Sequence, residues 1–169
     1  MKVLFIGDVV GMRSCEALQR ELHNIKQKLG AEVIIVNGEN SAEGNGINPA
    51  SAGAIFDAGA DVITTGNHCF RQKTMEAEWE HNERIIRPAN FDDEVIGRGI
   101  CVLDRGAYSI AVINLMGTTY MQPLENPFRC ADRLLESCDA RIKIVDFHAE
   151  ATSEKRAMGY YLASSTDNR

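Results

Sequence analysis

The stretch that decides the fold is Val3-Leu4-Phe5-Ile6-Gly7-Asp8-Val9-Val10-Gly11, an apolar run followed by an acidic residue between glycines. A short apolar run bounded by glycine is typical of a buried strand, and the glycines allow the chain to turn at its end. Three later apolar runs, at residues 33–36, 62–65 and 142–145, also lead into polar motifs. Those motifs are Asn37-Gly38-Glu39-Asn40, Gly66-Asn67-His68 and Asp146-Phe147-His148-Ala149-Glu150. The sequence therefore predicts four buried strands, each followed directly by a motif with polar side chains.

The remaining pattern predicts an α/β fold over residues 1–169 as a single domain. Strands are expected at 2–7, 32–37, 61–65 and 85–86, with helices at 14–29, 50–58 and 72–82. Such alternation favours a parallel sheet. The later part is expected to hold a hairpin (99–104 with 107–114), a helix (127–138), a strand (141–146) and a weak helix (153–162). This mixture predicts two sheets packed together, with helices outside.

Composition narrows the class of protein. The chain has 169 residues, 44% hydrophobic and 25% charged, which is ordinary for a globular domain. Its net charge of −6 disfavours a non-specific nucleic-acid coat. No apolar run approaches the length of a membrane span, and the first apolar run is too short for a signal-peptide core. The five cysteines form no Cys-x-x-Cys pair, so a reduced, cytoplasmic protein is expected, with Cys69 in a packing role.

The polar motifs predict a metal site. In an open parallel sheet, ligands bind at the carboxyl ends of the strands. Asp8, Glu39, Asn67 and His148 are therefore expected to meet at one sheet edge, although they are far apart in sequence. A set of oxygen and imidazole donors without a thiolate suits manganese, iron or another borderline divalent ion.

Each of these residues also has an ordinary structural interpretation. Asp8 could cap a turn or a helix, and Glu39 could be a solvated residue of an Asn-Gly turn. His148 could be a hydrogen-bonded structural histidine, and His68 either such a residue or a general acid. The amide oxygen of Asn67 needs a partner at a buried strand end, which a metal ion would supply. A dinucleotide-binding domain is disfavoured, because the first motif lacks the Gly-x-Gly-x-x-Gly spacing.

Taken together, the motifs resemble those of the calcineurin-like metallophosphoesterases. The longer strings are similar to the bacterial YmdB-like subfamily over residues 1 to about 162. They are Phe5-Ile6-Gly7-Asp8-Val9-Val10-Gly11, the three polar motifs, Arg87-Pro88-Ala89-Asn90, Ile113-Asn114-Leu115-Met116-Gly117, and the extension Ala151-Thr152-Ser153-Glu154-Lys155.

The resemblance implies an α/β/β/α sandwich with mixed sheets and a site with two divalent metal ions, iron or manganese. It implies that Asp8, Glu39, Asn67 and His148 are ligands, with Glu39 bridging the two ions. Asn40 would be a neighbouring metal or phosphate contact, and His68 the acid that protonates the leaving oxygen. The implied activity is metal-assisted hydrolysis of 2′,3′-cyclic nucleotides or related phosphoesters in the cytoplasm. RNA ends as substrates and a homo-oligomer are further expectations, and no membrane partner is expected.

Three departures from the subfamily pattern modify this expectation. Members continue well past the equivalent of residue 169 and carry a Gly-Thr-His-Thr-His motif that is absent here. The chain is therefore expected to be truncated at the C-terminus, with an incomplete fold and an incomplete metal site. Thr118 stands where relatives have Arg, and Met12-Arg13-Ser14-Cys15 replaces a Pro-Gly-Arg-like turn; both changes concern substrate contacts. The alternative function is a non-catalytic remnant of the fold that binds nucleotide or protein.

Overall fold

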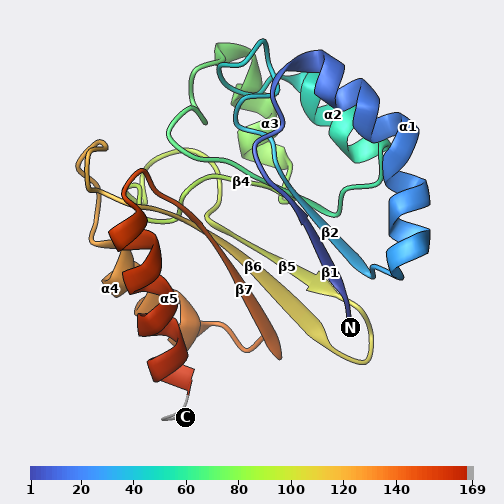
Figure 1. Ribbon diagram of the computed structural model, residues 1–169. Coiled ribbons are helices and arrows are strands. Elements are labelled where there is room, and N and C mark those ends of the chain that lie inside the picture. The colour runs from blue at the N-terminus through green and yellow to red at the C-terminus, as the bar shows by residue number, and fades with distance from the viewer. Residues whose placement is uncertain (167–169) are drawn as a thin grey trace.

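Two β-sheets lie face to face between two layers of helices (Figure 1). The computed structural model describes residues 1–166, so the last three residues of the predicted domain lie outside the described residues. The first sheet has the order β1 (Val3–Ile6), β2 (Val33–Asn37), β3 (Val62–Thr64), β4 (Ile85–Ile86), and all its pairs are parallel. The second sheet consists of β5 (Ile100–Asp104), β6 (Ser109–Met116) and β7 (Ile142–His148). β5 pairs with β6 antiparallel, and β6 with β7 parallel, so the predicted mixed α/β/β/α arrangement is confirmed.

The helices are divided between the two outer faces. The first sheet is covered by α1 (Gly11–Leu29), α2 (Pro49–Asp57) and α3 (Glu76–His81), the last preceded by a 3₁₀ turn, η1 (Lys73–Met75). The second sheet is covered by α4 (Pro127–Ser137) and α5 (Thr152–Thr166). No helix among residues 1–166 combines the length and the apolar composition that a membrane crossing requires.

The packing of β2 shows why its sequence is apolar without alternation. All of its residues are buried. Ile34 and Val36 pack with the helices of the first layer, while Val33 and Ile35 pack against the second sheet. A strand covered on both faces needs apolar residues at successive positions. Each fully buried Val or Ile side chain contributes about 1.5–3 kcal/mol relative to exposure, so this central strand fixes the stack of layers.

Element boundaries differ from the prediction mainly at the strand ends that matter for function. β6 runs to Met116 and β7 to His148, because these two residues are the last pair of the parallel register. The sequence pattern placed the ends of these strands at 114 and 146. His148 therefore lies within a strand instead of in the loop after one. α1 begins at Gly11, directly after Val10, which pairs with Asn40 in an isolated bridge.

The edge strands are partly open. β1 lies at one edge of the first sheet and β7 at one edge of the second. Val3 and Phe5 of β1 are 36% and 42% exposed, although they lie in register with the buried Val33 and Ile35. An open edge of this kind can pair with another chain. The predicted homo-oligomer stays a prediction.

Candidate functional site

The predicted site residues come together, and they come from both sheets. Asp8 follows β1, Glu39 follows β2 and Asn67 follows β3, all in the first sheet, whereas His148 ends β7 of the second sheet. The expectation that His148 shares one sheet edge with the other three was wrong. β7 pairs with β6, and His148 reaches the other residues because the carboxyl ends of the two stacked sheets meet.

His148 is the centre of the cluster. Its Nδ1 lies 3.2 Å from Glu39 Oε1, and its Nε2 lies 2.9 Å from Asn67 Oδ1. Donor atoms around one octahedral ion with bonds of about 2.1 Å lie about 3 Å apart. Only one ring nitrogen of His148 can bind a given ion, so one of these two contacts has the spacing of neighbouring metal ligands and the other is an ordinary hydrogen-bond contact.

Gly66 makes this convergence possible. A Cβ at this position would lie 2.4 Å from Glu39 Oε2 and 2.6 Å from the ring carbon Cγ of His148. Real Cβ atoms do not approach other heavy atoms so closely, so any side chain here would push the carboxylate and the imidazole apart. The glycine thus forms a cradle in which the two groups can face a common ligand.

A chain of hydrogen bonds links Asp8 to His68. Asn40 Nδ2 donates to Asp8 Oδ1 over 2.7 Å, and Asn40 Oδ1 lies 2.7 Å from His68 Nδ1. An ionised carboxylate only accepts hydrogen bonds, so the amide nitrogen of Asn40 must face Asp8 and its oxygen must face His68. His68 Nδ1 is then the donor, and Nε2 is the ring nitrogen left for chemistry. Asp8 has a left-handed backbone with φ of 46°, a conformation that a functional site can hold under strain.

Glu39 is almost fully buried, at 3% exposure, and its two oxygens face different elements. Oε1 faces His148 of the second sheet, while Oε2 accepts a hydrogen bond of 3.2 Å from the backbone N–H of His68. A carboxylate held in this way can bridge two positive charges. Within residues 1–166, no three His, Cys, Asp or Glu side chains are placed to hold a metal ion by themselves.

The cluster borders a cavity of about 280 Å³, and two of the residues around it were not predicted from the sequence. One is Asp146, whose Oδ2 is buried without a hydrogen-bond partner among the described residues. Burial raises the pKa of Asp146, against the opposing effects of Thr64, of the charge on His148 and of Asn37. Asp146 could have been found by its place two residues before His148, because residues i and i+2 of a strand share a face. The other is Lys155, near the beginning of α5.

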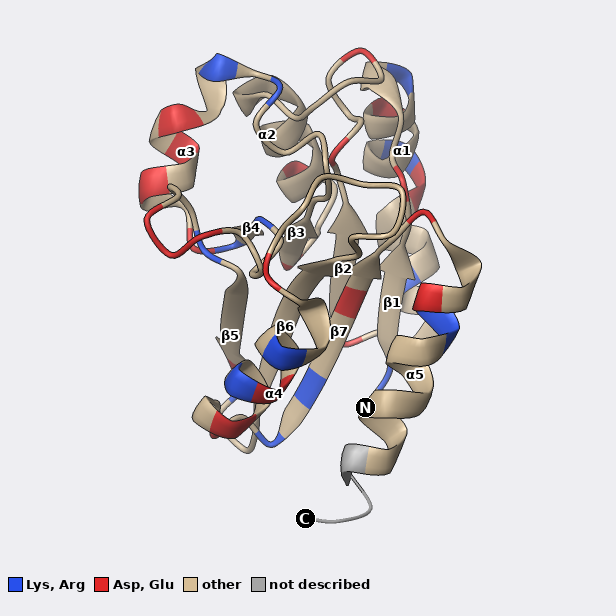
Figure 2. Ribbon diagram, turned by 90° about the vertical axis from the view of Figure 1, so that its left-hand side faces the viewer, with Lys and Arg blue, Asp and Glu red and all other residues tan. Residues whose placement is uncertain are grey.

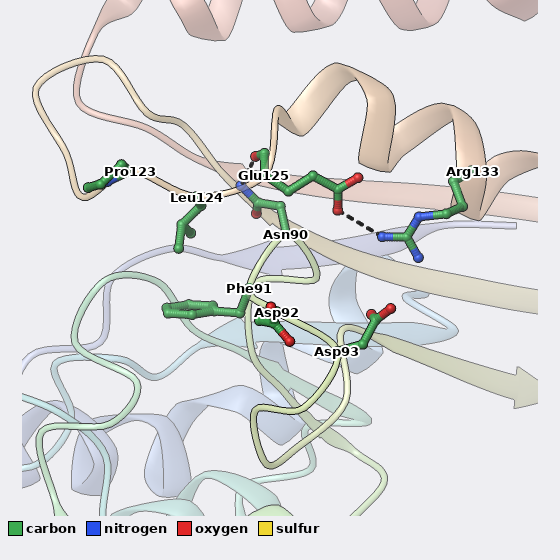
Figure 3. A pocket seen from close by; sticks show the side chains of 8 residues that line it. All are labelled: Asn90, Phe91, Asp92, Asp93, Pro123, Leu124, Glu125 and Arg133. Atoms are coloured by element: carbon green, nitrogen blue, oxygen red, sulfur yellow. Dashed lines mark hydrogen bonds and ion pairs between the residues drawn. The ribbon is translucent and has the colours of Figure 1, made fainter.

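A second cavity, of about 530 Å³, contains none of the predicted site residues (Figure 3). It lies between the loop after β4 and the loop before α4. Its single basic lining residue, Arg133, is paired with Glu125 at 2.9 Å. The predicted chemistry is therefore not located there. The residues that line it are Asn90, Phe91, Asp92, Asp93, Pro123, Leu124, Glu125 and Arg133.

Cys69, which follows His68, is part of the packed core. It is 1% exposed and packs among the apolar residues between the first sheet and its helices. Burial, followed by the charge of Glu39, raises the pKa of Cys69 to about 12. A thiol with such a pKa is protonated at neutral pH and is a poor nucleophile. This agrees with the packing role predicted for it.

Comparisons with known proteins identify relatives along nearly the whole chain. The model of the family described as "YmdB-like protein" matches residues 4–167. A 2′,3′-cyclic-nucleotide 2′-phosphodiesterase of Bacillus subtilis is 39% identical, covering 100% of this chain and 63% of the relative. A solved protein from Thermus thermophilus, described as hypothetical, superposes with a TM-score of 0.90 at 39% identity, over 96% of this chain and 63% of that one. A solved structure described as a novel phosphatase from Mycoplasma pneumoniae gives a TM-score of 0.89 at 33% identity, over 96% and 60%. The chain thus spans about three fifths of the length of these relatives.

Proposed function

The chain belongs to the YmdB-like protein family, and from this premise we propose that it acts in metal-assisted hydrolysis of phosphoesters, with 2′,3′-cyclic nucleotides as the substrate class. The observation that carries the proposal is the contact of both ring nitrogens of His148 with Glu39 and Asn67, at 3.2 and 2.9 Å. A carboxylate and an amide oxygen that follow strands of the first sheet thus converge on one imidazole of the second sheet, which brings oxygen and nitrogen donors of three separate strand ends to one place.

The residues that would hold divalent ions are Asp8, Glu39, Asn67 and His148. Their oxygen and imidazole donors suit manganese or iron, and the Gly66 cradle leaves no side chain between them. When bound, such ions supply charge neutralisation at the phosphoryl group and a water of lowered pKa. Glu39 is proposed as the bridging ligand, since its two oxygens face the two sides of the site.

His68 is proposed to protonate the leaving oxygen. Its Nδ1–H is held by Asn40, which is itself fixed by Asp8, so the imidazole has a defined orientation. To act as an acid, His68 must carry protons on both ring nitrogens; Nδ1–H is held by Asn40, and the proton on Nε2 is the one transferred. In the opening of a cyclic phosphate, the oxygen of a water molecule would bond to phosphorus, the bond between phosphorus and one ribose oxygen would break, and that ribose oxygen would take the proton from Nε2. Asn40 is proposed to position His68 and to neighbour the phosphate.

Metal analysis combined with an activity assay tests this proposal. The purified chain, loaded with Mn²⁺ and dialysed, is expected to retain metal and to hydrolyse bis-p-nitrophenyl phosphate and a 2′,3′-cyclic nucleotide. Retention of metal without hydrolysis of either compound would favour the non-catalytic alternative. Absence of both would contradict the proposed function. RNA ends as substrates and a cytoplasmic location stay predictions.

Replacing His68 by alanine distinguishes a role as general acid from a role as metal ligand. We expect the rate of hydrolysis to fall by about 10²- to 10⁴-fold, which is the usual contribution of a general acid. Metal content should not change, because His68 contacts Glu39 through its backbone N–H, which alanine retains. The measurement is elemental analysis beside kcat for each protein. Loss of metal from His68→Ala would show that His68 is a ligand and that its assigned role is wrong.

A further inference from the structure

We propose that Lys155 binds the phosphoryl group of the substrate, an inference that rests on the proposed function of the same site. Lys155 belongs to the first turns of α5, where an acidic and a basic segment adjoin (Figure 2). It lines the cavity of about 280 Å³ together with Asp8, Glu39 and His148. It thus stands beside the proposed metal ligands without belonging to any of the four strand ends that supply them.

The charged residues that line the cavity are mainly acidic, so a single basic side chain there is placed to bind an anionic group of the substrate. Three lining residues are acidic, namely Asp8, Glu39 and Asp146, and Lys155 is the basic one. Within the part of the chain that the structure describes, the ammonium of Lys155 makes no hydrogen bond and no ion pair. An anionic phosphoester entering this cavity would be repelled by the carboxylates that metal ions do not neutralise. A free ammonium at the rim supplies the opposite charge and up to three hydrogen-bond donors for phosphoryl oxygens.

The fold fixes the beginning of α5 against the site. Glu154 Oε1 accepts hydrogen bonds from the backbone N–H and the hydroxyl of Thr118, at 3.0 and 3.4 Å. Its Oε2 accepts from the backbone N–H of Thr119 at 3.3 Å. The residue before this loop, Gly117, donates its N–H to the carbonyl oxygen of His148 at 2.9 Å. The backbone of Lys155 is therefore tied, through its neighbour, to the strand that carries a proposed ligand.

The contact between Glu154 and the loop at residues 117–119 is tightly packed around Gly117. A Cβ on Gly117 would lie 2.3 Å from Glu154 Oε2 and 2.7 Å from the Cβ of Ala149. A side chain here would displace Glu154 and with it the first turn of α5. The hydroxyl of Thr118 is engaged with Glu154 Oε1. Thr118 brings no positive charge to this loop, so among the residues that line the cavity Lys155 is the one with an ammonium group that can bind the phosphate.

The test compares Lys155→Met with Arg156→Met. Both variants remove one positive charge from adjacent positions of α5, but Arg156 does not line the cavity. With Mn²⁺ present, calorimetric titration with inorganic phosphate should show roughly 5- to 50-fold weaker binding for Lys155→Met, the loss of one charge-assisted contact. Arg156→Met should bind phosphate within about twofold of the unchanged chain, since exposed charges contribute little. Lys155→Arg, which keeps the charge, should restore most of the affinity.

Two further titrations keep this inference separate from the proposed function. Mn²⁺ should bind to Lys155→Met at least as well as to the unchanged chain, because a repelling charge has been removed; weaker Mn²⁺ binding would assign Lys155 a structural role and overturn the inference. Without Mn²⁺, phosphate at low ionic strength should still shift the backbone NMR signals near Lys155, and Lys155→Met should remove that shift while Arg156→Met retains it. Equal responses of the two variants would overturn the inference whatever the metals do. Failure of the unchanged chain to bind Mn²⁺ would instead contradict the proposed function.

Discussion

Replacing Glu39 by alanine is expected to abolish both metal binding and hydrolysis. Glu39 is 3% exposed, and its two oxygens contact opposite sides of the site. Loss of a residue that hydrogen-bonds to a metal ligand already lowers metal affinity or activity by about 10- to 100-fold, and loss of a bridging ligand itself should lower them further. We therefore expect Mn²⁺ affinity to fall by more than about 100-fold and hydrolysis to fall to background.

The control for Glu39→Ala is Glu21→Ala, which removes an exposed carboxylate from α1 and should leave both quantities unchanged. Glu39→Gln keeps the shape of the side chain but not its charge, so it should lie between the alanine variant and the unchanged chain. Calorimetry with Mn²⁺ and the rate of bis-p-nitrophenyl phosphate hydrolysis measure the two effects. A Glu39→Ala variant that still holds metal tightly would show that the carboxylate is structural.

Replacing Gly66 by alanine should damage the site nearly as much, although it removes no functional group. The new Cβ would collide with Glu39 Oε2 and with the ring of His148. Either the two groups separate, which lowers metal affinity by roughly 10- to 100-fold, or the strand end shifts. Forcing an extra methyl group into a packed place also costs about 1–3 kcal/mol of stability.

Gly53 offers a matched control for the glycine-to-alanine change. It lies in α2, and a Cβ there would meet nothing within 4 Å. Gly53→Ala should leave metal binding unchanged and stabilise the helix by about 0.5–1 kcal/mol. Thermal unfolding and Mn²⁺ titration of both variants make the comparison. Normal metal binding by Gly66→Ala would mean that the groups around this glycine do not need to face a common ligand.

Much of the fold follows from local pattern. The apolar runs before Asp8, Glu39 and Asn67 form parallel strands, and the predicted hairpin around residues 105–106 is present. The final helix, predicted as weak, extends over Thr152–Thr166. Its formation is explained by contacts far apart in sequence, since Met158 and Leu162 pack on the second sheet and Glu154 holds the loop at Thr118.

The sequence pattern does not determine which strands pair. His148 follows an apolar run like the others, yet its strand belongs to the second sheet, a choice made by register with β6. For the same reason, Asp146 and Lys155 were part of the quoted motifs but were not predicted as site residues. The possible role of the Asp146 carboxylate and the Lys155 ammonium depends on the residues of other elements beside them, and the stacking of the two sheets determines which residues those are.

The central claim is that Asp8, Glu39, Asn67 and His148 hold a divalent ion. Anomalous X-ray diffraction from a crystal soaked in Mn²⁺ tests it most directly. We predict an anomalous peak in the cavity beside His148, about 2.0–2.4 Å from donor atoms of at least three of these residues. A peak at another place on the chain, or none in this cavity at saturating Mn²⁺, would contradict the account.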